Sequence, residues 1–444
     1  MGCGVFDSPP YASFEEGFTV IGLVDCNNFY CSCERVFQPW YNGKPVGVLS
    51  NNDGCVIARS QELKALGVEM GTPAFKIKDL IKAKKVYLFS SNYELYGDMS
   101  NRVQSILEEY SAGIEPYSID ECFVKFEGFE RNQLIEHCHD LRQKVKKFTG
   151  IPVCVGVAPT RTLSKLANRI AKKVARFDGV FVIENKDKRL EKILERIDVG
   201  DVWGIGRKLV GKLNAMGIYT ALDLSRTDSR EMKKAFSVVL ERTILELQGK
   251  PCITMNDYHE PKKRIMTSRS FGKLTDDFEQ IQQAIRQHAQ RGAEKLREQN
   301  SLCRAVLVFL QTNRYRQDLA QYSPSFVIEL ENPSDDSREI IAGAGRCLRE
   351  VYREGYHFMK GGVMLIDLID SDKNQMSLLD DSESVEKREK AEKLMSVIDS
   401  VNEKMGRQSV RFGLPSGNAS WHLRCSNRSN RYSTRWDELP KAQT

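Results

Sequence analysis

The stretch EPYSIDECFVKF, residues 115–126, places two carboxylates, Asp120 and Glu121, side by side in a run that otherwise predicts a β-strand. A buried charge is costly unless it is paired or binds a metal ion. A third acid, Asp25, stands where the apolar run of FTVIGLVDCNNFY, residues 18–30, ends. The sequence therefore predicts two central strands that carry three acids in need of cations.

These three acids suit magnesium, which prefers hard oxygen ligands and is commonly held by a few carboxylates plus substrate phosphates. Two such ions about 3.5–4 Å apart stabilise an attacking hydroxyl and a leaving pyrophosphate together. Adjacent residues of a regular strand point to opposite faces, so only one of Asp120 and Glu121 should face Asp25. Either the strand bends there, or one of the two acids pairs with a neighbouring Lys or Arg.

Length and composition are those of a soluble globular protein. The chain has 444 residues, 41% of them hydrophobic and 28% charged, which suggests about two to four domains. It has no apolar stretch near the roughly 20 residues that span a membrane, so we expect no membrane partner. Residues 1–18 carry no targeting signal and are expected to be a disordered lead-in. The twelve cysteines form no CxxC pair, which favours reduced, packed thiols over disulfides or zinc.

The segment RTLSKLANRIAKKVAR, residues 161–176, predicts an amphipathic helix with a basic face. The basic side chains that share this face are Arg161, Lys165, Arg169, Lys172 and Arg176. A solvated helix face usually mixes Glu with Lys, whereas no acid interrupts this stripe. The pattern favours contact with a polyanion over a merely solvated surface.

Strands and helices alternate up to about residue 190, which predicts an α+β sheet domain with helices on one side. The stretch VWGIGRKLVGKLNAMGI, residues 202–218, then fits a helix-hairpin-helix. Gly204 and Gly206 would let the backbone approach a DNA phosphate, with Arg207 and Lys208 following at the start of a helix. The alternative is an ordinary tight turn between two helices.

Residues 262–370 predict a third unit with the order β-α-β-β-α-β. Five basic residues decorate its strands and favour a sheet face that binds a nucleic acid backbone, namely Arg264, Arg269, Lys273, Arg304 and Arg314. Beyond residue 370 the chain turns acidic and polar, then basic and aromatic. Residues 371–444 are therefore expected to form a flexible tail.

Several of these motifs carry a family resemblance. VDCNNFY at 24–30 and YSIDECF at 117–123 closely resemble the two catalytic motifs of Y-family translesion DNA polymerases. LSNNDGCVIARS, FSSNYELYGDMSNRV and RYSTRWDELP resemble the UmuC branch, the catalytic subunits of bacterial DNA polymerase V. The resemblance covers about residues 18–440. It implies an error-prone, magnesium-dependent DNA polymerase of the SOS response that works in the cytoplasm at the nucleoid.

The resemblance also implies a right-hand architecture of the α+β class. Its expected parts are a ferredoxin-like palm at 19–190, small fingers inserted at about 37–98, a helical thumb at 191–255, a little finger at 260–370 and the tail at 371–444. These parts leave no stretch for a proofreading exonuclease.

Metal-binding roles follow from the resemblance residue by residue. Asp25 and Asp120 would bridge two Mg²⁺ ions, and Glu121 would complete the site of the ion that activates the primer 3′-hydroxyl. The backbone carbonyl of Cys26 would bind the nucleotide-associated ion.

Nucleotide-binding roles follow in the same way. Phe29 would floor the pocket, and Tyr30 would be the steric gate that excludes a ribose 2′-hydroxyl. Lys172 stands where the family has a triphosphate-binding lysine, with Lys165 as its helper. The family's usual Tyr-x-x-Arg of the fingers is absent, since Gln61 and Lys64 stand there. Arg59 and Lys64 are offered in its place as phosphate contacts.

A partner peptide is expected in KNQMSLLDD, residues 373–381. Gln375, Leu378 and Leu379 resemble the short peptide by which bacterial polymerases dock on the sliding clamp, although its final aromatic residue is missing. The alternative is fraying of the preceding strand. Besides primer-template DNA, dNTPs and the clamp, the resemblance implies a UmuD-type accessory dimer and RecA as partners.

Three other functions were weighed against a DNA polymerase. A catalytically inactive DNA-binding scaffold would keep the basic surfaces without needing all three acids. A nucleotidyl cyclase uses paired carboxylates but needs neither a helix-hairpin-helix nor a basic third unit. An RNA polymerase or primase is disfavoured if Tyr30 is a steric gate.

Overall fold

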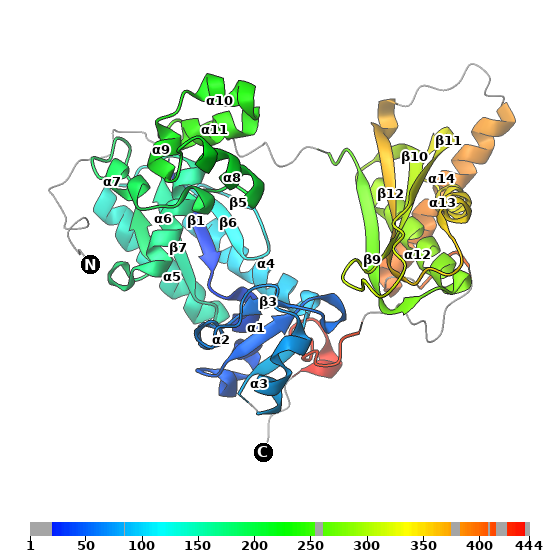
Figure 1. The fold of residues 1–444 in the computed structure, drawn as a ribbon, viewed down its shortest axis with the longest axis horizontal. Helices are drawn as coiled ribbons and strands as arrows, with labels where there is room; N and C mark the ends of the chain where they lie inside the picture. Colours follow the sequence, from blue (N-terminus) through cyan, green and yellow to red (C-terminus); the bar gives the residue numbers. More distant parts are fainter. Residues whose placement is uncertain are drawn as a thin grey trace. The chain divides into compact units, whose positions relative to one another are not determined.

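The fold is known from a computed structural model that describes residues 20–83, 85–253, 261–373, 382–406, 409–413 and 424–439. The chain divides into two compact units (Figure 1). Unit 1 contains residues 1–258 and 425–444, and unit 2 contains residues 259–424. The chain thus leaves unit 1, builds unit 2, and returns to unit 1 with its last residues.

A five-stranded sheet forms the centre of unit 1, in the order β5-β6-β1-β7-β8. The strands are β1 Val20–Cys26, β5 Gly113–Pro116, β6 Glu121–Phe126, β7 Val153–Ala158 and β8 Val180–Val182. Strand β1 pairs antiparallel with both β6 and β7. Its nearly continuous apolar sequence suits this central position, because both of its faces are covered.

Helices cover both faces of this sheet, so the expectation of helices on one side is wrong. Helices α4 (Tyr93–Tyr110) and α5 (Arg131–Thr149) share a core with Val155, whereas α6 (Arg161–Lys173) shares a second core with Cys154. Neighbouring residues of β7 therefore face opposite cores. Gly156 lets α6 approach closely, because a Cβ at this position would overlap the backbone of Asn168.

A small sheet in the order β3-β2-β4 lies where the fingers were expected. Its strands are β2 Val46–Leu49, β3 Val56–Arg59 and β4 Tyr87–Ser90, and its helices are α2 Gln61–Ala65 and α3 Lys78–Lys82. A separate small core that includes Leu63 and Val56 holds these elements together. Helix α1 (Phe29–Phe37) leads from β1 into this region.

Five short helices follow the central sheet. They are α7 Leu190–Glu195, α8 Arg207–Ala215, α9 Ala221–Ser225, α10 Ser229–Ala235 and α11 Val238–Leu247. They share the core on the α6 face of the sheet. The turn before α8 contains Gly204 at φ +88°, a conformation that glycine adopts without steric cost.

Unit 2 has the predicted order β-α-β-β-α-β. Its elements are β9 Ile265–Thr275, α12 Phe278–Glu298, β10 Ser301–Thr312, β11 Ser325–Ser334, α13 Ser337–Val351 and β12 Phe358–Asp370. The strands form one antiparallel sheet in the order β11-β10-β12-β9. Residues of alternate strand positions, such as Val306 and Leu365, join α12 and α13 in one core, which confirms the split arrangement read from the sequence.

The expectation of a flexible tail is wrong for two segments. Helix α14 (Ser382–Met405) buries Met395 against unit 2, and Asp399 accepts two hydrogen bonds from Arg297 at 2.6 and 2.9 Å. Residues 425–439 pack on unit 1, where Tyr432 stacks on Phe37. Apolar burial and ion pairing order these segments, although their composition is polar. The expected lead-in at 1–18 and the clamp peptide at 375–379 lie outside the described residues.

The remaining broad expectations concern membranes and cysteines. None of the helices in the described ranges combines the length and the apolar character that crossing a membrane requires. The cysteines within those ranges are free thiols, and most of them are buried. They pack as small apolar groups, as predicted.

Candidate active site

The three acids meet at the ends of β1 and β6. Asp25 is the register partner of Glu121 in the antiparallel pair β1–β6. Asp120 precedes the strand, in a turn where its carbonyl accepts a hydrogen bond of 2.8 Å from the backbone N–H of Cys26. Because Asp120 is not part of the regular strand, strict alternation does not apply to it. The sequence left open a bend or the pairing of one acid with a neighbouring Lys or Arg. Both are present, because the chain bends at residues 118–120 and Glu121 pairs with Lys165.

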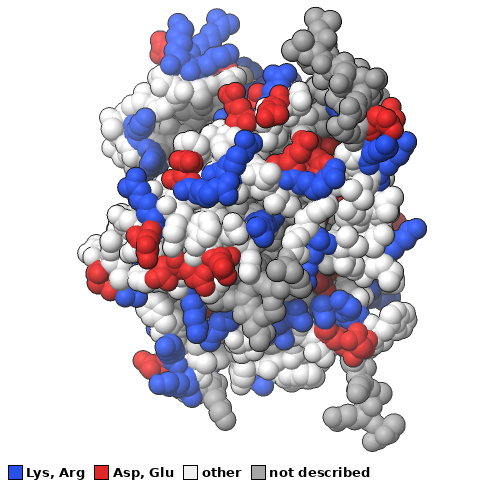
Figure 2. Space-filling model, turned by 90° about the vertical axis from the view of Figure 1, so that its right-hand side faces the viewer, with Lys and Arg blue, Asp and Glu red and all other residues white. Residues whose placement is uncertain are grey.

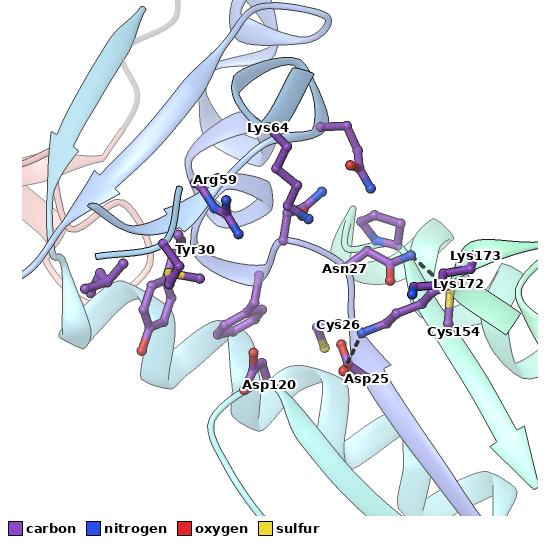
Figure 3. A pocket seen from close by; sticks show the side chains of 17 residues that line it. Asp25, Cys26, Asn27, Tyr30, Arg59, Lys64, Asp120, Cys154, Lys172 and Lys173 are labelled. Atoms are coloured by element: carbon purple, nitrogen blue, oxygen red, sulfur yellow. Dashed lines mark hydrogen bonds and ion pairs between the residues drawn. The ribbon is translucent and has the colours of Figure 1, made fainter. Parts of the chain in front are cut away.

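A pocket of about 980 Å³ opens beside Asp25 and Asp120 (Figure 3). It is lined by the end of β1, the start of α1, and parts of β3, α2 and α6. Eight residues predicted for the site line it: Asp25, Cys26, Phe29, Tyr30, Arg59, Lys64, Asp120 and Lys172. The tertiary fold thus brings together side chains that are up to about 150 residues apart in the chain.

Asp25 is the most buried of the three acids, with 9% of its surface exposed. Burial raises the pKa of its carboxyl to about 6, although the ammonium group of Lys172 acts in the opposite direction. Lys172 forms an ion pair with Asp25 across the pocket. A carboxylate in this position depends on a neighbouring cation.

Glu121 lines a second, adjacent pocket of about 380 Å³ together with Lys165. The Lys165 ammonium lies 2.8 Å from a carboxylate oxygen of Glu121 and 4.3 Å from the ring centroid of Tyr117. Trp203 adds a second ring at 5.2 Å, so Lys165 is held by charge and by cation–π attraction. Asp25 and Lys172 line both pockets, and Asp25 therefore stands between them.

The three acids do not form a ready-made metal cluster. Across the described part of the chain, no three His, Cys, Asp or Glu side chains are grouped to hold an ion. Instead, lysines hold Asp25 and Glu121, and the Ser118 hydroxyl donates a hydrogen bond of 2.6 Å to Asp120. The donor set nevertheless fits a hard divalent cation, because it offers carboxylate oxygens at an open pocket. Such a cation would take over the charge balance that the lysines now provide.

Tyr30 lies in the pocket wall against aromatic side chains of α4. Its ring stacks on Tyr96 with a centroid distance of 4.5 Å and meets the edge of Tyr93 at 6.1 Å. Burial raises the pKa of Tyr30 to about 12, so its hydroxyl is neutral at physiological pH. Phe29 is buried beside it.

The two cations expected from the fingers also face the pocket. The Lys64 ammonium donates a hydrogen bond of 2.7 Å to the Asn28 side chain, and the Arg59 guanidinium donates one of 2.8 Å to the Val68 carbonyl. Burial and the nearby Arg59 lower the pKa of Lys64. Both cations are thus positioned by short contacts, and Figure 3 shows them on the side of the pocket opposite Asp120.

The expected basic stripe of α6 is not a uniform polyanion-binding face. Arg161 is fully buried and forms two hydrogen bonds with the Glu115 carboxylate, at 2.8 and 2.6 Å. Arg169 pairs with Asp201, and Arg176 lies beyond the end of the helix. The acids come from other elements, which the helix sequence does not reveal.

Several pocket residues were not predicted as site residues, among them Asn27, Asn28, Cys154 and Lys173. Asn28 caps α1 in the left-handed conformation at φ 49°, which Asn tolerates better than most residues. Both asparagines belong to the motif VDCNNFY, so an Asn pair at a strand-to-helix turn was the available signal. Lys173 follows Lys172 directly and carried no separate signal.

The predicted helix-hairpin-helix residues lie apart from these pockets. Gly206 caps α8, and Arg207 and Lys208 are exposed in its first turn. The preceding Trp203 donates a hydrogen bond of 3.2 Å from its ring N–H to the Tyr117 hydroxyl. This contact ties the turn to the β5–β6 connection that carries Asp120.

Comparisons with known proteins identify three parts of the chain as belonging to one family. Residues 24–169 match the impB/mucB/samB family, residues 187–218 match its HHH motif, and residues 262–378 match its C-terminal domain. Residues 392–442 match a domain of unknown function.

Full-length relatives agree with these matches. Protein ImpB of Salmonella typhimurium is 43% identical over 96% of this chain and 100% of its own length. Protein UmuC of the same species is 43% identical over 95% and 99%, and protein MucB of Escherichia coli is 37% identical over 95% and 99%.

Solved structures show the same fold. A Y-family DNA polymerase chimera, Dbh-Dpo4(243-245)-Dbh, superimposes with a TM-score of 0.60 at 24% identity, over 79% of this chain and 99% of that one. An insertion ternary complex of Dbh DNA polymerase gives a TM-score of 0.50 at 24% identity, with the same coverage. The expected right-hand polymerase fold is confirmed. The chain belongs to the impB/mucB/samB family, the UmuC-type branch of the Y-family DNA polymerases.

Proposed function

We propose that this translesion DNA polymerase adds nucleotides at the large pocket beside Asp25, with Asp25, Asp120 and Glu121 holding two Mg²⁺ ions. The reaction joins the primer 3′-oxygen to the α-phosphorus of a dNTP, releases pyrophosphate, and gives up the hydroxyl proton to solvent. The observation that carries the proposal is the convergence of Asp25 and Asp120 with four basic side chains and Tyr30 around one pocket.

The metal ions, when bound, would neutralise charge on the attacking oxygen and on the triphosphate. Asp25 stands between the two pockets and is assigned to both ions, together with Asp120. Glu121 lines the second pocket, which we assign to the primer end. The Cys26 carbonyl is proposed as a further ligand on the nucleotide side.

The chain's own cations would orient the triphosphate. Lys172 lies on one wall of the pocket, and Arg59 and Lys64 lie on another. Electrostatic complementarity of this kind holds the phosphates without covalent chemistry by the protein. The resemblance implied that Lys165 helps Lys172 to bind the triphosphate, but Lys165 contacts Glu121 and lines only the second pocket. We therefore assign it to the primer side instead.

DNA contacts are proposed at two places. The first is the turn at Gly204 and Gly206, with Arg207 and Lys208 beside it. The second is the face of the unit 2 sheet opposite its helices, where Lys263 and other residues line a hollow of about 540 Å³. Figure 2 shows the side of the molecule at the right of Figure 1, where basic and acidic side chains of the described residues are interspersed.

The proposal is tested by primer extension with Mg²⁺ and dNTPs opposite an abasic site, with and without accessory proteins. Asp120→Asn should lower the extension rate by ~10³-fold or more, because the charge that holds two dications is reduced. Asp79→Asn, a matched change at an exposed acid of α3, should keep the parental rate. An extension rate of Asp120→Asn close to that of the parent would refute the two-metal assignment.

The inactive scaffold is not favoured by the family relationship, and the same assay separates it from a polymerase. A scaffold would bind primer-template DNA but extend it under none of these conditions. The parent protein should instead extend the primer past the abasic site.

We also propose that the polymerase works at the bacterial nucleoid with a sliding clamp, a UmuD-type dimer and RecA. The clamp peptide is assigned to Gln375, Leu378 and Leu379, and a second contact of this kind would raise the local concentration of the polymerase at the primer end. Changing all three to Ala should abolish stimulation by the clamp while clamp-free extension persists. Equal stimulation of the triple variant and the parent would remove the peptide from the proposal.

A further inference from the structure

The C-terminal segment 425–439 binds the start of helix α4. The Asn92 side-chain amide donates hydrogen bonds to the carbonyls of Ser429 and Asn430, both at 3.1 Å, and to the Ser429 hydroxyl at 3.0 Å. Two residues earlier, at the end of β4, Ser90 and Asn427 exchange two hydrogen bonds of 3.0 Å. The segment is therefore attached by specific contacts next to the aromatic residues of α4.

The same segment reaches a buried acid of helix α1. Glu34 is fully buried. One of its carboxylate oxygens accepts hydrogen bonds from the Tyr96 hydroxyl at 2.6 Å and from the Ser429 hydroxyl at 3.0 Å. The other oxygen has no hydrogen-bond partner within the described residues. A buried carboxylate that lacks a cation depends strongly on each hydroxyl that contacts it.

The Tyr96 ring links this buried acid to the nucleotide pocket. It stacks on the Tyr30 ring with an interplanar angle of 17°. Tyr93 meets both rings edge-on, and both Tyr93 and Tyr96 lie on the first turn of α4 next to Asn92. Moving the start of α4, or rotating the Tyr96 ring, would shift the surface against which Tyr30 rests.

We propose that the C-terminal segment is a positioning element for sugar selection, acting through Ser429, Glu34 and Tyr96 on the ring of Tyr30. The inference rests on the proposed role of Tyr30 as the steric gate. It assigns a role to part of residues 392–442, which match a domain of unknown function. Loss of any one contact should loosen Tyr30 and admit more ribonucleotides.

Three variants of the full-length chain each change one residue in this series of contacts. Ser429→Ala removes the hydroxyl from which the segment donates a hydrogen bond to Glu34. Tyr96→Phe removes the other hydroxyl but keeps the ring that stacks on Tyr30. Asn92→Ser removes the amide that binds the segment and keeps a side chain that can cap α4. Trp436→Ala is the matched control, because Trp436 lies in the same segment and is 91% exposed.

The readout is the ratio of kcat/KM for ribonucleotide to that for deoxyribonucleotide in primer extension, with thermal unfolding measured for every variant. Each of the three variants should raise this ratio about 3- to 10-fold, whereas Trp436→Ala should leave it at the parental value. A purely structural role would lower both rates together and leave the ratio unchanged. Both kcat/KM values are measured on the same variant, so a smaller fraction of folded enzyme lowers both equally. The ratio therefore remains informative for a variant that is less stable.

Tyr30→Ala separates the inference from the proposed function. If Tyr30 is the gate, the single variant Tyr30→Ala should raise the ratio more than any of the three contact variants does. Adding Ser429→Ala to it should raise the ratio no further. A raised ratio in Tyr30→Ala with parental ratios in all three contact variants would overturn the positioning role and leave the gate intact. A parental ratio in Tyr30→Ala would overturn the gate and the inference with it.

Discussion

The two ends of helix α6 carry ion pairs of opposite kinds. At its start, Arg161 and Glu115 pair with side chains that are 0% and 2% exposed. Near its end, Lys172 pairs with Asp25 at the wall of an open pocket, and its side chain is 33% exposed. One basic stripe thus contains a cation enclosed by the protein and a cation that a ligand can reach.

The two ion pairs differ in whether another cation can take the place of the basic side chain. A guanidinium that forms two hydrogen bonds with a carboxylate in the core has a fixed geometry and no competitor. A lysine at a pocket can turn from Asp25 toward a phosphate when another cation takes its place. The buried pair therefore belongs to the fold and the pocket pair to the proposed chemistry.

Glu34 adds a third case, because its only described partners are the hydroxyls of Tyr96 and Ser429. Burial raises the pKa of Glu34 to about 7. Glu115, Asp25 and Glu34, three of the buried acids of unit 1, thus differ in whether the partner of the carboxylate is an arginine, a lysine or a pair of hydroxyls. Four predictions test this comparison.

The largest effect is expected for Arg161→Ala. It leaves the Glu115 carboxylate buried without a cation, which typically costs about 3–5 kcal/mol of unfolding free energy. Urea unfolding of the full chain measures this loss. Arg161→Met combined with Glu115→Leu should recover most of it, since no buried charge remains. A loss below about 1 kcal/mol for Arg161→Ala would remove the distinction between the two ends of α6.

The second effect is a pH dependence of stability that Glu34 controls. Between pH 4.5 and 7 the folded state retains a proton that the unfolded state has released, since the pKa of Glu34 is raised from 4.5 to about 7. The free energy of unfolding should therefore fall by roughly 3 kcal/mol as the pH rises through this window. Urea unfolding of the parent and of Glu34→Gln at several pH values measures this fall in the free energy of unfolding. The variant should not show it, because its amide does not titrate. Parallel curves for the two proteins would contradict it.

The third effect is catalytic and distinguishes Lys172 from Arg161. Lys172→Met should lower kcat/KM for nucleotide addition about 10- to 100-fold, which corresponds to about 1.4–2.8 kcal/mol. Its stability should fall less than that of Arg161→Ala, because the Lys172 side chain is 33% exposed and Asp25 lines an open pocket. Single-turnover incorporation and urea unfolding measure the two quantities. A stability loss as large as that of Arg161→Ala would show that Lys172 is also structural.

The smallest effect concerns salt dependence of DNA binding. Arg207→Gln with Lys208→Gln should reduce the slope of log affinity against log salt by about two units, one for each lost phosphate contact. Arg169→Gln should leave the slope unchanged, because Arg169 already pairs with Asp201. Fluorescence anisotropy with primer-template DNA at several KCl concentrations compares them. An equal reduction of the slope for the two variants would show that Arg169 also contacts DNA.

Local patterns predicted a large part of this structure. The order of elements in unit 2 followed from alternating apolar periodicity, and the turn at Gly204 followed from glycine spacing. The family resemblance predicted eight of the residues that line the large pocket, but it did not point to Asn27, Asn28, Cys154 or Lys173. Patterns failed where partners come from distant segments, as for Arg161, whose acid lies 46 residues away.

The sequence by itself predicted most strands and helices of the two units, the family motifs and the three acids that two of these motifs carry. Only the tertiary structure decided that Arg161 is buried, that Lys172 pairs with Asp25 and Lys165 with Glu121, and that residues 425–439 return to unit 1. The physical reason is that periodicity reports which side of an element is apolar, a property of neighbouring residues. The partner of a charge or hydroxyl depends instead on which distant segments the folded chain brings into contact.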